Sequence, residues 1–135
     1  MSRVLVIDDD IDMTAMLTMV LGTAGFDVKA ANTSLDGVNA ARSWSPDVII
    51  LDLMMPGMDG MQVCHEVRQF SQVPILILSV VDKPNVIAQA LDEGADDYLV
   101  KPVPGGVLVA HINTLSRRNR PEAFARSLQV QARLR

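Results

Sequence analysis

Three aspartates are the residues of this sequence best suited to chemistry, because of what precedes them. Asp8 and Asp9 follow one apolar run, and Asp52 directly follows another. Mg²⁺ prefers oxygen ligands and typically takes one or two carboxylates together with waters and a phosphate oxygen. Mn²⁺ accepts similar ligands. The three carboxylates, with the backbone carbonyl of Met54, therefore form a candidate site for Mg²⁺, and Mn²⁺ is an alternative.

A hydroxyl and an ammonium group end two further apolar runs. Ser79 follows residues 75–78, and Lys101 follows residues 99–100. Each residue could also have a purely structural role, because Ser79 can cap a loop and Lys101 can form a salt bridge with the nearby acids. A fixed lysine can also hold a phosphoryl oxygen as a point charge. Together with the aspartates, these two residues predict a site for a divalent cation and a phosphoryl group.

The elements that must position these side chains alternate along the chain. Short apolar runs typical of strands are separated by longer segments with helical spacing. This alternation predicts an α/β fold with a doubly wound, five-stranded parallel sheet and five helices on its two faces. The carboxyl ends of parallel strands line one crevice, which would collect all the residues named above. The strands are expected at 4–7, 27–30, 48–51, 75–78 and 98–100, and the helices at 11–21, 34–44, 61–68, 84–94 and 107–115.

Length and composition restrict the class of protein. The chain has 135 residues, a net charge of −4 and one cysteine, Cys64. It is long enough for one domain, and it cannot form an internal disulfide. Its negative net charge does not favour binding to DNA or to an anionic membrane. No apolar run reaches the roughly 18 residues of a membrane-spanning helix. We therefore expect a cytoplasmic domain that contacts neither nucleic acid nor membrane.

The last part of the chain differs in character. Residues 119–135 contain four arginines and a single acidic residue, Glu122. Pro121 interrupts or ends a helix at this point. We expect residues 1–118 to form the domain and residues 119–135 to be a helical extension or a linker.

Four stretches of the sequence carry motifs in a fixed order. They read VLVIDDD at 4–10, PDVIILDLMMPGMDG at 46–60, PILILS at 74–79 and GADDYLVKP at 94–102. In this order they resemble the response-regulator receiver domains of two-component signalling. The last motif is most similar to the branch whose output domains are winged-helix DNA binders. The resemblance covers residues 3–118 and implies a flavodoxin-like sheet with strand order 2-1-3-4-5.

The resemblance implies a role for each residue of the crevice. Asp52 would accept a phosphoryl group from a phosphohistidine of a sensor histidine kinase or phosphotransfer protein. The metal would be held by Asp8, Asp9, Asp52 and Met54, and Lys101 and Ser79 would bind phosphoryl oxygens.

A switch is implied as well. Ser79 and Tyr98 would change the conformation of the face formed by residues 84–94, 98–100 and 107–115. This face would control an output domain that regulates transcription. The bond between Lys101 and Pro102 is expected to be cis. Such a domain would be no enzyme beyond its own phosphoryl transfer and autodephosphorylation.

Some positions depart from the family pattern. Val80 replaces the small residue that usually follows the switch hydroxyl, so we expect slower turnover of the phosphoryl group. Ile87, Val107 and His111 occupy positions where charged residues usually support a dimer through this switch face. The standard homodimer is therefore an open question. An apolar contact through Ile87 and Val107 is one alternative, and a place in the core is the other.

Two other functions compete with the switched receiver. A Mg²⁺-dependent hydrolase with an aspartyl nucleophile would need a second acid where Met54 stands. A degenerate or stand-alone receiver that serves only for docking would not need the complete set of site residues. A nucleotide-binding fold is disfavoured, because no glycine-rich phosphate loop follows the first strand and Asp8 and Asp9 stand there instead.

Overall fold

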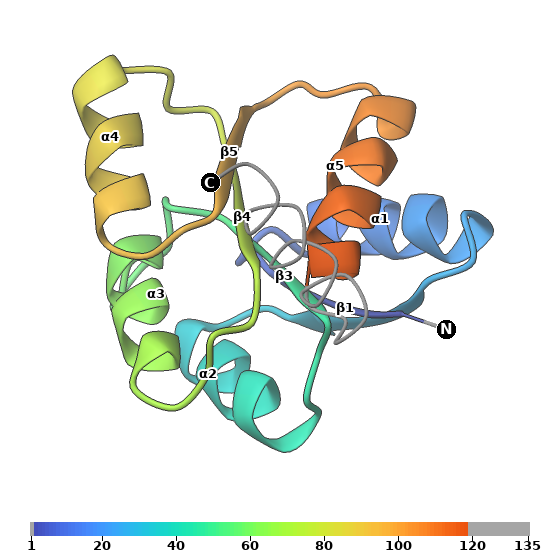
Figure 1. The fold of residues 1–135 in the computed structure, drawn as a ribbon, viewed down its shortest axis with the longest axis horizontal. Coiled ribbons are helices and arrows are strands. Elements are labelled where there is room, and N and C mark those ends of the chain that lie inside the picture. Colours follow the sequence, from blue (N-terminus) through green and yellow to red (C-terminus); the bar gives the residue numbers. More distant parts are fainter. Residues whose placement is uncertain (1, 119–135) are drawn as a thin grey trace, which may run out of the picture.

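The computed structural model describes residues 2–118, which form a five-stranded parallel sheet with helices on both sides (Figure 1). The strand order is β2-β1-β3-β4-β5, as the resemblance implied. The predicted extension at 119–135 lies outside the described residues. The strands are β1 (Arg3–Ile7), β2 (Asp27–Ala31), β3 (Val48–Leu51), β4 (Ile75–Ser79) and β5 (Asp97–Val100), and the helices are α1 (Ile11–Thr23), α2 (Ser34–Ser43), α3 (Gly60–Arg68), α4 (Pro84–Asp92) and α5 (Gly105–Arg118).

The predicted elements are all present, with small shifts at their ends. The largest shift is in α5, which covers Gly105–Arg118 where helical spacing predicted 107–115. Helix α1 begins where expected, because the Asp10 side chain accepts hydrogen bonds from the backbone of the first turn. It ends before Gly25, whose φ of 97° is a conformation that side chains other than glycine's rarely adopt.

The sheet separates two apolar layers (Figure 1). Helices α1 and α5 cover one face, where their leucines pack on Val4, Val6 and alternate residues of β3 and β4. Helices α2, α3 and α4 cover the other face, where they meet Leu5, Ile7 and the remaining positions of the same strands. Because both faces are covered, the strands at the centre read as continuous apolar runs. The polar residues that follow them are left at the rim of the sheet.

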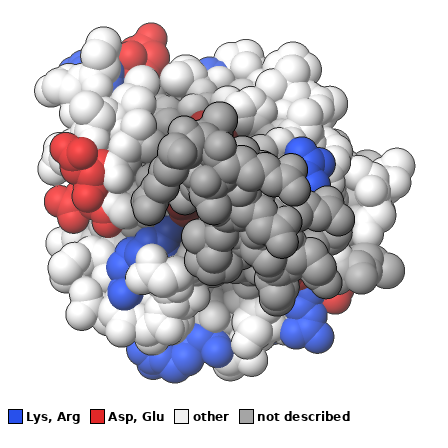
Figure 2. All heavy atoms as spheres, viewed as in Figure 1, with Lys and Arg blue, Asp and Glu red and all other residues white. Residues whose placement is uncertain are grey.

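On the face seen in Figure 2, the visible lysines and arginines form several small, separate groups toward its edges, and the visible acidic residues lie mainly at the left edge and the top. No helix among residues 2–118 is both long and apolar enough to cross a membrane.

Candidate functional site

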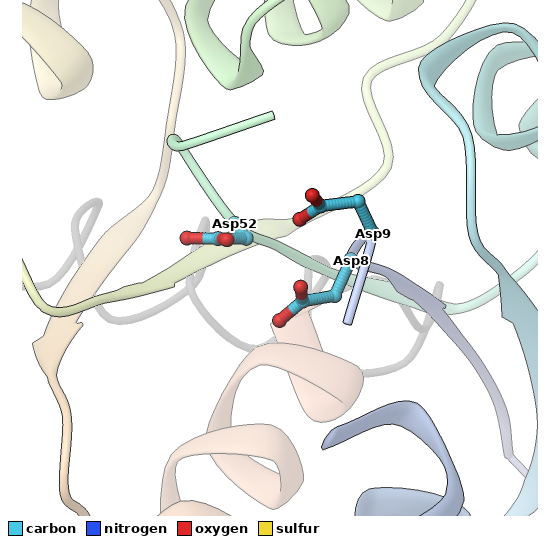
Figure 3. A group of neighbouring side chains, drawn as sticks. All are labelled: Asp8, Asp9 and Asp52. Carbon is cyan, nitrogen blue, oxygen red and sulfur yellow. The ribbon is translucent and has the colours of Figure 1, made fainter. Parts of the chain in front are cut away.

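The three predicted carboxylates lie together at the carboxyl ends of β1 and β3. These neighbouring strands run parallel with Ile7 opposite Leu51, so Asp8 and Asp52 come next on adjacent strands. One carboxylate oxygen from each of Asp8, Asp9 and Asp52 lies within 4.8 Å of the others. Figure 3 shows the three side chains extending toward the same side of the strand ends. This is a donor set suited to Mg²⁺.

Burial decides the electrostatics of this cluster. Asp8 and Asp52 are buried, whereas Asp9 is exposed. The pKa of Asp52 is raised, chiefly because burial penalises its charged form. The ammonium of Lys101 and a backbone hydrogen bond from Met54 oppose that rise, while Asp8 and Asp9 add to it. A bound divalent cation would favour the ionised form of all three carboxylates.

Lys101 reaches the cluster from β5. Its Nζ lies 3.1 Å from Oδ2 of Asp8, and the side chains of this pair are only 14% and 5% exposed. The backbone N–H of Lys101 donates to the carbonyl of Ser79 at 2.8 Å, which fixes the lysine at the end of the sheet. The peptide bond to Pro102 is cis, as the resemblance implied. The sequence expectation that Lys101 pairs with the acids is confirmed.

Ser79 and Tyr98 both make hydrogen bonds to the same residue of the loop after β4. Ser79 is fully buried, and its hydroxyl accepts a hydrogen bond from the backbone N–H of Val81 at 3.3 Å. The Tyr98 hydroxyl donates to the carbonyl of Val81 at 2.6 Å. Burial raises the pKa of Tyr98, so its hydroxyl keeps its proton at neutral pH. Val81 thus connects the two residues that the sequence named as a switch.

The segment from Leu53 to Gly60 contains Met54, whose backbone N–H donates to the Asp52 carboxylate. The backbone N–H groups of Met55 and Gly60 both donate to the carbonyl of Leu53, which folds the segment back on itself. A Cβ at Gly60 would lie 2.4 Å from the Asp52 carbonyl oxygen and 2.6 Å from Cα of Leu53. Only glycine allows this close approach, which brings the start of α3 against the end of β3.

Comparison with known proteins identifies the family. The model of the response regulator receiver domain matches residues 4–113. The chain belongs to this family. It is therefore a signalling receiver domain of the two-component response regulators.

Related sequences and solved structures support the same family assignment. The chain is 41% identical over 120 residues to the DNA-binding response regulator MtrA of Mycobacterium tuberculosis, covering 89% of this chain and 53% of MtrA. It thus spans about half the length of the curated relatives it matches. The Francisella response regulator 1452 receiver domain superposes with a TM-score of 0.85 at 30% identity, covering 89% of this chain and all of that one. The BeF3-activated receiver domain of Klebsiella pneumoniae RstA has a TM-score of 0.83 at 29% identity, covering 86% of this chain and 99% of that one.

Val80 directly follows Ser79 at the end of β4. Its side chain is 65% exposed, and that of Met54 on the neighbouring loop is 61% exposed. Both border a groove of about 870 Å³ that is mostly apolar. The Val80 side chain therefore lies outside the core, on the groove beside the loop that carries Met54.

The face around β5 carries contacts that sequence reasoning missed. Nδ1 of His111 lies 2.5 Å from Oδ2 of Asp97, so the histidine pairs within its own chain. The guanidinium of Arg68 binds Asp96 at 2.9 Å and also three backbone carbonyls around the α3–β4 and α4–β5 turns. No local pattern announces these pairs, because the partners lie 14 and 28 residues apart. Val107 is 45% exposed, so of the two alternatives left open for this residue, a place in the core is excluded.

Asn32 is another residue whose contacts the sequence did not predict. Its side-chain amide donates to the backbone carbonyl of Asp8 and to the Thr14 hydroxyl, both at 2.9 Å. It therefore supports the backbone of a predicted metal ligand, while Thr33 caps α2.

Proposed function

We propose that Asp52 accepts a phosphoryl group from the phosphohistidine of a sensor histidine kinase or phosphotransfer protein. Asp8, Asp9, Asp52 and the Met54 carbonyl would hold Mg²⁺, with Mn²⁺ as a substitute. The single observation that carries this proposal is the group of three carboxylate oxygens within 4.8 Å, two of them from buried residues. Such a group is electrostatically unfavourable without a cation, and it suits one well.

The transfer itself requires positioning and charge neutralisation. A carboxylate oxygen of Asp52 forms a bond to phosphorus while the bond from phosphorus to the histidine nitrogen breaks, and that nitrogen keeps the electron pair. Mg²⁺ would neutralise charge on the phosphoryl oxygens. Lys101 would bind one such oxygen, so its ammonium would be shared between the phosphoryl group and Asp8. The product is an acyl phosphate on the chain's own side chain, which makes the domain a switch.

The switch would run through Val81. The new phosphoryl oxygens would accept a hydrogen bond from the Ser79 hydroxyl, which now contacts the Val81 N–H. Tyr98 is bonded to the carbonyl of the same residue. A shift of the loop after β4 would therefore bias the position of Tyr98, and with it the face formed by α4, β5 and α5. Phosphorylation would change the populations of two states of this face.

The same face is the proposed contact to partners. We infer that residues 1–118 are the receiver and that residues 119–135 are an Arg-rich extension or linker, in a regulator whose output is transcriptional. MtrA, which extends well beyond the matched region, is by name a DNA-binding regulator. A homodimer through α4, β5 and α5 would have an apolar contribution from Ile87 and Val107. The receiver itself would not contact DNA.

Intact mass spectrometry tests the proposal. The native chain and Asp52→Asn would be incubated with Mg²⁺ and acetyl phosphate, a small phosphodonor. A single phosphate adduct on the native chain alone is the expected result. Absence of any adduct on the native chain would favour a docking module, and continuous release of phosphate at about 1 s⁻¹ or more would favour a hydrolase.

A further inference from the structure

The outer part of the loop after β3 has one hydrogen bond to the rest of the described fold, besides the packing of Met58 against the core. Among residues 2–118, segment 56–58 makes one hydrogen bond to another element, in which the Ser34 hydroxyl donates to the carbonyl of Met58. Ser34 is only 6% exposed, and its Oγ also lies 4.0 Å from Sδ of Met55. The hydroxyl therefore sits beneath the loop that carries the Met54 carbonyl.

The start of α2 is held rigidly enough to serve as an anchor. The Thr33 hydroxyl accepts a hydrogen bond from the backbone N–H of Asp36 at 3.1 Å, which fixes the first turn. One turn on, α2 lies so close to β1 that a Cβ at Gly37 would be 2.7 Å from the Ile7 side chain. Ser34 is thus presented from a helix that packs directly on the central sheet.

The neighbouring residue connects the same helix start to the other side of the site. Asn32 donates to the Asp8 carbonyl at 2.9 Å, while Ser34 donates to Met58. Residues 32–34 consequently contact both segments that supply the carboxylate cluster, the one after β1 and the one after β3.

We propose that Ser34 is a positioning residue for the magnesium and phosphoryl site. Its hydroxyl holds the loop in the conformation in which the Met54 carbonyl and the Asp52 carboxylate face the same ion. This inference rests on the proposed function, because it assumes that the cluster binds Mg²⁺. Ser34 touches neither the ion nor the phosphoryl group, so its effect is transmitted through the loop.

A purely structural role is the alternative, and the chain offers a matched control. Ser116 is 4% exposed, and its hydroxyl is hydrogen-bonded to that of Ser2 at 2.9 Å. This pair lies at the amino end of β1, opposite the carboxyl ends that carry the cluster. Ser34→Ala and Ser116→Ala each remove one buried hydroxyl, but only the first removes a contact to the loop.

The experiment measures Mg²⁺ affinity by calorimetry on the native chain and both variants, together with their thermal midpoints. Loss of one ordinary hydrogen bond predicts a dissociation constant about fivefold higher for Ser34→Ala. Ser116→Ala should bind Mg²⁺ with native affinity, although its midpoint falls by a similar amount. Ser34→Cys keeps the volume and replaces the hydroxyl by a weak donor, so it should weaken Mg²⁺ binding without leaving a cavity.

Two results would overturn the role of Ser34. One is native Mg²⁺ affinity in both Ser34 variants, and the other is equal weakening in Ser116→Ala. A native chain that binds no Mg²⁺ would instead refute the proposed function, so the two failures are distinguishable.

Discussion

Asp52→Asn should stabilise the fold when no divalent cation is present. The native side chain is buried beside the carboxylates of Asp8 and Asp9, and Lys101 is the one cation among residues 2–118 that lowers its pKa. The substitution keeps the shape of the side chain and removes its charge. The variant thus relieves both the desolvation of a charge and its repulsion by two neighbours.

The magnitude follows from the geometry. Two unit charges 4.8 Å apart interact by about 3.5 kcal/mol at an effective dielectric constant of about 20. Asp52 is repelled by two carboxylates and attracted by one ammonium, so roughly one such repulsion is left over. Asp9 is exposed and screened by solvent, which reduces the relief to about 1–2 kcal/mol. In a domain of this size that raises the thermal midpoint by about 3–7 °C.

The assay is thermal unfolding in EDTA and in Mg²⁺, with Asp36→Asn as the control, because Asp36 is an exposed carboxylate outside the cluster. Mg²⁺ should raise the native midpoint by preferential binding to the folded state, and it should raise that of Asp52→Asn much less. Asp36→Asn should keep the full response to Mg²⁺.

The pH dependence has a definite sign. Because the pKa of Asp52 is raised in the folded state, its ionised form destabilises the fold above that pKa. The penalty begins to shrink as pH falls through the folded pKa and is gone below the unfolded pKa, so the advantage of Asp52→Asn in EDTA should shrink on acidification. A variant less stable than the native chain in EDTA at neutral pH would refute this reasoning.

Three further predictions concern other parts of the site. Val80→Ala should speed autodephosphorylation several-fold by opening the approach for water, whereas Val107→Ala, which shortens another exposed valine, should leave the rate unchanged. An unchanged rate of adduct decay in Val80→Ala would contradict the role of the Val80 side chain. Lys101→Met should lower the rate of phosphorylation by about 10²-fold or more, because it removes a charge-stabilising group, and the variant should still bind Mg²⁺. Rapid adduct formation in Lys101→Met would show that the ammonium is dispensable. Gly60→Ala should destabilise the fold by about 1–3 kcal/mol, because its Cβ would overlap the backbone at the end of β3. In Gly22→Ala the new Cβ in α1 meets nothing within 4 Å, so this control should be neutral or stabilising. Denaturant unfolding measures the free energy of unfolding of both variants.

The order of apolar runs and the residues that end them sufficed to predict the architecture. Runs without polar alternation imply strands buried on both faces, and helical segments between them imply a parallel sheet. In such a sheet the carboxyl ends share one rim, so Asp8, Asp52, Ser79 and Lys101 had to meet there. The sequence pattern thus predicted which residues gather at the rim, while the strand order and the role of each residue were implied by the resemblance to receiver domains.

Tertiary structure decided the contacts that depend on packing. The pairing of Lys101 with Asp8 joins residues 93 positions apart, and the bond from Ser34 to Met58 joins residues 24 apart. The partner of a polar side chain depends on how closely each helix packs on the sheet, because that packing limits the rotamers the side chain can adopt. The sequence determined which groups gather at the rim, whereas only the folded packing determined how they are held.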